Sequence, residues 1–91
     1  MLRMTIKAQT TKQVVLALHG KVVGPDVQLL AQEGDVYLQA TPRLVLDLDA
    51  VSFIDQYGLA LLKRWQDQGL ALCGGSPFLQ ALLATHGLTV C

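Results

Sequence analysis

Alternating apolar and polar positions open the chain and indicate two strands. Residues 4–9 and 13–19 each alternate with a period of two, and Thr10, Thr11 and Lys12 lie between them. This pattern predicts a β-hairpin, because successive side chains of a strand point to opposite faces of its sheet. The chain should therefore begin with an antiparallel pair of strands.

A helical period replaces the alternation over residues 25–40, where apolar residues recur every 3.6 positions. The helix should stop at Thr41, because the residue before a proline is pushed out of the α region. Gly34 costs about 1 kcal/mol relative to alanine inside a helix. It therefore either lets the helix approach the sheet closely or marks a break before Asp35.

Residues 43–49, RLVLDLD, form a nearly continuous apolar run of strand length. Such a run is typical of a central strand that is covered on both faces. Asp55 then has the residue type of an N-cap, and a single apolar stripe predicts a helix over residues 56–68. A short strand at residues 70–73 follows.

The last helix is predicted over residues 77–86, with Ser76 as its cap and a proline in its first turn. Gly87 and Leu88 have the pattern of a glycine cap whose leucine contacts the helix again at Leu83. The three residues that follow are enough only for a short edge strand or a frayed end.

The predicted order is β-β-α-β-α-β-α, followed by either a short edge strand or a frayed end. Strands that alternate with helices predict a mostly parallel sheet joined by right-handed crossovers, to which the hairpin adds one antiparallel strand. We therefore expect one α/β domain over residues 1–91, with a mixed, mostly parallel sheet of four or five strands and three helices.

Composition and charge narrow the classes of function. The 91 residues are 52% hydrophobic and 15% charged, and seven basic residues balance seven acidic ones. Zero net charge does not supply the basic surface that nucleic acid or anionic lipid needs, so neither is expected as a partner. It mildly favours a stable protein partner or a homodimer. We expect no signal peptide or membrane span and, with only Cys73 and Cys91, a reduced cytoplasmic chain without a disulfide framework.

Residues for catalysis are sparse. Nucleophilic catalysis would pair Cys73 or a serine with His19 or His86, but a strand end and a helix end explain the two histidines. The paired glycines Gly74 and Gly75 precede a helix and could hold a phosphate, although a tight turn is the simpler interpretation. We expect no enzyme activity and no cofactor.

Three carboxylates near one strand end, Asp47, Asp49 and Asp55, could hold a hard cation such as magnesium. The favoured alternative is structural. In that interpretation Asp55 caps a helix, Asp47 accepts backbone N–H groups from a neighbouring loop and Asp49 is solvated. We therefore expect no metal.

Residues 44–62, LVLDLDAVSFIDQYGLALL, resemble the signature of the STAS domain, which occurs in bacterial anti-sigma factor antagonists and in sulfate transporters. VVLALHGKV resembles the family's second strand, and SPFLQALLATHGL resembles its last helix. The resemblance spans about residues 13–88. It implies a small α/β domain without catalytic activity that docks onto partners through the loop and helix start at Asp55 and Gly58.

Two departures from the family pattern bear on function. Gln56 occupies the position at which family members carry a serine or threonine that a partner kinase phosphorylates, so a phosphate switch is chemically impossible there. The second helix is also about one turn shorter than usual. The resemblance implies a partner-binding site at Ser52, Asp55, Gln56, Tyr57, Gly58 and Leu59.

Three partner classes remain open on this resemblance. The first is a regulatory protein such as a kinase-like anti-sigma factor ATPase or a transporter subunit. The second follows from GLALL at residues 58–62, which resembles the small cytoplasmic subunit of lipid-transport ABC systems. The third is a nucleotide or lipid, at the Asp55 turn or at the Gly74-Gly75 turn.

Overall fold

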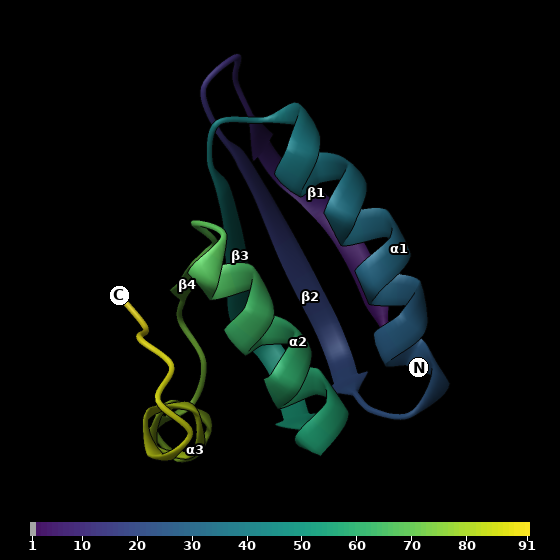
Figure 1. Ribbon diagram of the computed structural model, residues 1–91. Coiled ribbons are helices and arrows are strands. Elements are labelled where there is room, and N and C mark those ends of the chain that lie inside the picture. Colours follow the sequence, from purple (N-terminus) through teal and green to yellow (C-terminus); the bar gives the residue numbers. More distant parts are fainter. Residues whose placement is uncertain (1) are drawn as a thin grey trace.

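The computed structural model describes residues 2–91, which form four strands and three helices (Figure 1). All seven predicted elements are present in the predicted order. They are β1 (Arg3–Gln9), β2 (Val14–Val22), α1 (Pro25–Ala40), β3 (Leu44–Ile54), α2 (Gln56–Asp67), β4 (Ala71–Cys73) and α3 (Pro77–Thr85).

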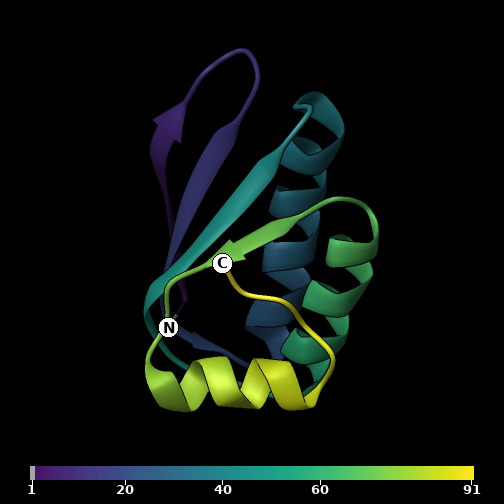
Figure 2. The ribbon, with the colours of Figure 1, turned by 90° about the vertical axis from the view of Figure 1, so that its left-hand side faces the viewer.

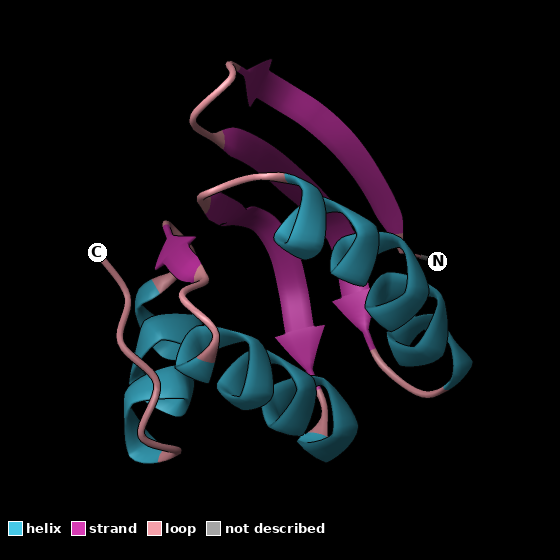
Figure 3. Ribbon diagram, turned by 45° about the horizontal axis from the view of Figure 1, so that its top comes forward, coloured by secondary structure: helices cyan, strands magenta, loops and turns pink. Residues whose placement is uncertain are grey.

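The strands form one mixed sheet in the order β1-β2-β3-β4 (Figure 3). β1 pairs with β2 in antiparallel fashion, whereas the β2–β3 and β3–β4 pairs are parallel. Each parallel connection runs through a helix, because a parallel neighbour needs a crossover. The predicted hairpin and the mostly parallel α/β architecture are confirmed.

β3 continues to Ile54, five residues beyond the predicted end at Asp49. Its pairing with β2 shifts register twice, after Asp47 and after Val51, and each shift adds one residue to β3. Such bulges break the alternation of side chains, so that Asp49 and Ala50 are both exposed. The sequence therefore shows no strand period there, although the ladder continues.

The helices cover only one face of the sheet (Figure 2). The side chains of Leu44, Leu46 and Leu48 are buried in the core beneath the helices. Val45 and Asp47 alternate with them and therefore lie on the other face, where a groove of about 620 Å³ is open to solvent. The prediction that helices cover both faces of this strand is wrong, because a charged residue on the second face makes it partly polar.

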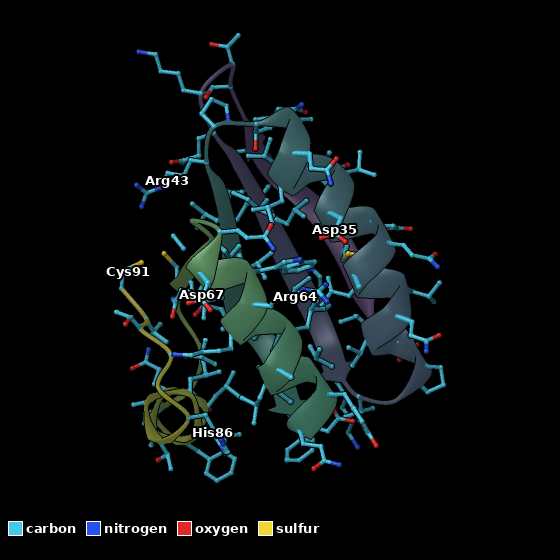
Figure 4. The ribbon with its side chains drawn as sticks, in the orientation of Figure 1. Asp35, Arg43, Arg64, Asp67, His86 and Cys91 are labelled. Carbon is cyan, nitrogen blue, oxygen red and sulfur yellow. The ribbon has the colours of Figure 1, made fainter. Side chains whose placement is uncertain are left out.

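The close approach that Gly34 permits is to α2 and not to the sheet. α1 is continuous through Gly34, which is buried, and a Cβ atom there would overlap the Trp65 ring. The Trp65 indole N–H donates a 2.8 Å hydrogen bond to Asp35, which lies on α1 on the side facing α2 (Figure 4). Trp65 is fully buried between the two helices.

Both ends of α3 have the caps that the sequence predicts. The Ser76 side chain accepts the Leu79 N–H at 3.1 Å, and after Gly87, at φ 78°, the N–H of Leu88 donates to the Leu83 carbonyl at 2.9 Å. This bond is the glycine-cap pattern that closes a helix end. The last residues form a single parallel bridge, from Leu72 to Val90, instead of a fifth strand.

Within residues 2–91, no helix combines the length and the hydropathy that crossing a bilayer demands.

Candidate functional site

The sequence-predicted site lies where β2 and β3 end and α1 and α2 begin. Asp55 joins these segments with both carboxylate oxygens. Oδ1 accepts the backbone N–H of Gly58 and Oδ2 accepts that of Gly24, each at 2.9 Å. The Asp55 N–H donates to the Val22 carbonyl at 3.1 Å. The predicted cap is confirmed, and it also fastens the start of α1, which the sequence did not indicate.

Two glycines let the backbones meet at this carboxylate. Gly24 has φ of 54°, a conformation that other residues rarely adopt, and it caps α1. A Cβ atom at Gly58 would lie 2.7 Å from Ile54 Cγ2 and 2.9 Å from the Val22 carbonyl oxygen. Any other residue at position 58 would therefore push α2 away from the strand ends.

The contacts of Asp55 keep its carboxylate charged. The backbone N–H of Gly58 is the largest influence that lowers the pKa of Asp55, with Gly24 adding to it and partial burial opposing it. A negative charge at the N-terminus of α2 also interacts favourably with the positive end of the helix dipole. The turn is thus held by a fixed anion, with α2 starting at a defined position.

Three of the predicted site residues are exposed around this anchor. Tyr57 is 62% exposed, Gln56 is exposed beside it, and Ser52 is exposed on the last part of β3 with its hydroxyl 3.4 Å from the Gly20 carbonyl oxygen. Gly58 and Leu59 are buried beneath them. The six predicted residues therefore comprise three exposed side chains, the Asp55 carboxylate that holds the turn, and two buried residues.

Two features of this end of the sheet were not predicted from the sequence. Phe53 is 42% exposed on the last part of β3, where it pairs with Lys21, and its position is set by the bulges in β3, which alternation cannot reveal. A cavity of about 430 Å³ also lies beside Tyr57, and its other walls come from the start of α1, including Pro25 and Val27. The signal for the second was present in Gly24-Pro25, which places a helix start at this end of the sheet.

The three carboxylates considered for a metal have separate partners. The Asp47 carboxylate binds the Lys7 ammonium and accepts the Asp49 N–H, and the hydrogen bond from Lys7 is the largest influence that lowers the pKa of Asp47. Asp49 accepts the Gly75 N–H at 2.9 Å. The loop contact predicted for Asp47 therefore belongs to Asp49. Within residues 2–91, no group of three or more potential ligands is arranged to hold a metal ion.

The Asp49 carboxylate of this chain already occupies the Gly74-Gly75 turn. Asp49 Oδ1 accepts the Gly75 N–H, and a Cβ atom at Gly74 would overlap the same carboxylate. An anion bound to these N–H groups would meet a negative charge at the position it needs. This geometry argues against the turn as a phosphate site.

Comparison with known proteins supplies an independent view of the fold. No family model and no curated protein matches the sequence. Solved structures do match. The anti-sigma factor antagonist SpoIIAA in its unphosphorylated form gives a TM-score of 0.80 at 18% identity, covering 94% of this chain and 82% of that one. The phosphorylated form from Bacillus gives 0.74 at 18% identity over 94% and 85%.

An anti-sigma factor antagonist from Mycobacterium paratuberculosis also gives a TM-score of 0.80, at 22% identity, covering 96% of this chain and 79% of that chain. These matches cover at least 94% of this chain and 79–85% of the matched chains. The chain therefore has a STAS-like fold, the fold of the anti-sigma factor antagonists.

Proposed function

We propose that this chain is a non-catalytic, cytoplasmic protein-interaction module of the anti-sigma factor antagonist type. It docks a regulatory protein through the α2 docking patch, defined as Ser52, Asp55, Gln56, Tyr57, Gly58 and Leu59. The observation that carries the proposal is Tyr57, a ring 62% exposed on a turn that the Asp55 carboxylate holds in place.

The chemistry of the patch suits a protein partner. An exposed tyrosine offers a large ring and a polar tip at low entropic cost, which is why tyrosine is common among residues that anchor interfaces. None of the six patch residues is basic, and Lys63, which lines a cavity with Gln56 and Leu59, donates to the Gly87 carbonyl, so the patch itself offers a phosphate no cation.

The GLALL segment does not select the lipid-transport alternative. Gly58, Leu59, Leu61 and Leu62 are all buried, and three of these side chains pack in the core. A helix that must bury one face against this sheet needs such residues whatever its partner is. The segment is therefore explained by packing, and we favour the regulatory partner.

Control of the proposed module differs from that of a phosphorylated antagonist. One of the matched proteins is described in a phosphorylated form. Gln56, at the corresponding position by resemblance, carries an amide and has no hydroxyl to accept a phosphoryl group. Regulation therefore comes from abundance, from competition between partners or from the state of the partner.

Site-directed photocross-linking tests this proposal in the source organism. A benzophenone amino acid replaces Tyr57 in one variant and Val36 in a control. Val36 is 65% exposed on α1, beside a different cavity. We expect one protein to be cross-linked from position 57 and not from position 36. Equal cross-linking from both, or cross-links only between copies of this chain, would contradict the proposal.

A further inference from the structure

The two cysteines are brought side by side by the strand register. Cys73 is the last residue of β4, and Cys91 lies 18 residues later. Leu72 pairs with Val90 in a parallel bridge, and the Cys91 N–H donates to the Leu72 carbonyl at 2.9 Å. This register places Cys91 opposite Cys73, and Figure 4 shows Cys91 on the β4 side of the sheet.

The side chains of such a pair share one face of the ladder. Residues that are opposite each other on adjacent strands point to the same side, and adjacent strands lie about 4.7–4.9 Å apart. That spacing is within the range of about 4.4–6.8 Å that a disulfide spans between its Cα atoms. The register therefore places the Cα atoms of the two cysteines within the reach of a disulfide.

Both cysteines are accessible to a small-molecule oxidant. Cys91 is exposed, and Cys73 is partly exposed at the edge of the groove on the open sheet face. They are the only cysteines in the sequence, so no third thiol competes within the chain. The Cys91 thiol donates a 2.9 Å hydrogen bond to the Leu72 carbonyl, and a hydrogen bond with Cys91, followed by burial, raises the pKa of the Cys73 thiol.

We propose that Cys73 and Cys91 are a reversible dithiol pair, a redox modification site whose disulfide fastens residues 88–91 to β4. The oxidant class is a small-molecule disulfide such as oxidised glutathione. This inference is independent of the α2 docking patch. It differs from a structural disulfide framework, because the bond forms and breaks in a reducing compartment.

The reaction proceeds in two exchanges. The exposed Cys91 loses its proton to solvent, and its thiolate attacks one sulfur of the oxidant, which releases one glutathione thiolate and leaves a mixed disulfide. Cys73 then loses its proton and attacks the Cys91 sulfur, which releases the second glutathione. Two protein thiols are oxidised to one disulfide, and one glutathione disulfide is reduced to two glutathione molecules.

The test titrates the full chain, at low concentration, with mixtures of reduced and oxidised glutathione. Remaining thiols are alkylated with N-ethylmaleimide, and intact masses are measured. We expect the monomer to lose both alkylation sites together, without a glutathione adduct, and to regain both with dithiothreitol. The melting temperature of the oxidised monomer should be higher by roughly 10 °C, because the bond closes a loop in the unfolded chain.

Two variants make the result specific. Cys73→Ser should accumulate a glutathione adduct on Cys91, since the resolving thiol is gone. The double variant Cys91→Ser, Val90→Cys keeps two thiols but moves one by a residue, to the opposite face of the ladder, and should not form the intramolecular bond. Glutathione adducts or intermolecular disulfides as the main products of the parent chain would overturn the proposal. Equal bond formation by the double variant would also overturn it.

Discussion

Gly34 on α1 lies against the indole ring of Trp65 on α2, and this contact sets the distance between the two helices. No other residue fits at position 34, since even a methyl group would overlap the ring. The adjacent Asp35 fixes the orientation of the indole through its N–H. One glycine thus accounts for how two helices share one face of a narrow sheet.

Gly34→Ala should therefore lower the free energy of unfolding by about 1–3 kcal/mol through overpacking. In an exposed helix interior the same change stabilises by about 1 kcal/mol, so the sign distinguishes the two situations. Urea denaturation followed by circular dichroism measures it. Combining Gly34→Ala with Trp65→Leu should recover part of the loss, whereas simple additivity of the two changes would mean that the residues do not meet.

A second prediction follows from the core, which lies on only one face of the sheet. Leu46 is fully buried beneath the helices, and Leu46→Ala should cost about 2–5 kcal/mol of unfolding free energy as a core cavity. Val15→Ala, on the open face of the neighbouring β2, should cost less than about 1 kcal/mol, because water can fill the space left. Similar losses in urea denaturation would show that the second face is covered as well.

Stability should fall in acid through two named carboxylates. The hydrogen bond from Lys7 lowers the pKa of Asp47, and the N–H of Gly58 lowers that of Asp55, whereas in the unfolded chain both are near the ordinary value of about 3.9. Below that value the unfolded state binds more protons than the folded state. The stabilisation is therefore complete above about pH 5 and is lost as the pH falls through the lowered values.

Asp55→Ala should remove one of these contributions. At pH 7 it should lower the free energy of unfolding by about 0.5–2 kcal/mol through loss of the cap, and its further decline below pH 4 should be shallower than that of the parent. Asp67→Ala, at the exposed end of α2, controls for the loss of a carboxylate from the same helix. A decline for Asp55→Ala as steep as in the parent would show that this carboxylate does not couple folding to pH.

The proposal that the turn carries no phosphate switch is tested by intact-mass measurement. Incubation with a kinase that copurifies with the chain should leave the parent's intact mass unchanged, because Gln56 has no hydroxyl. Gln56→Ser restores the hydroxyl and should gain one phosphate if that kinase recognises the turn. A phosphate on Ser52 or Tyr57 of the parent would reinstate regulation by phosphorylation.

The elements that the sequence predicted best are the helices, whose starts are marked by capping residues and prolines. α1 begins at Pro25, α2 follows the Asp55 cap and α3 begins after Ser76, and each of these signals acts within one helical turn. The end of β3 was missed because bulges depend on the partner strand, which no local pattern specifies. The open sheet face was missed for a related reason, since a run such as LVL does not reveal which of its faces a helix covers.

In the candidate site, too, contacts between residues close in the sequence could be predicted, whereas contacts between distant residues could not. The cap function of Asp55 toward Gly58 could be predicted, because the two residues are three apart in the sequence. Its second bond, to Gly24, joins residues 31 apart and depends on how α1 begins. The cavity beside Tyr57 likewise arises only when α1 and α2 begin at the same end of the sheet. The exposure of Phe53 depends on the bulges in β3.

The most direct test of the account measures the affinity of the cross-linked partner by isothermal titration calorimetry. Gln56→Glu adds a charge at the position where, by the resemblance, family members carry a phosphate, and Tyr57→Ala removes the exposed ring. Each should weaken binding by at least about 1 kcal/mol, roughly fivefold in Kd, while the melting temperature stays nearly unchanged. Val36→Ala, on the exposed side of α1, should bind like the parent. If Gln56→Glu and Tyr57→Ala both bind with the parent's affinity, the partner does not dock at the start of α2, and the proposed function is contradicted.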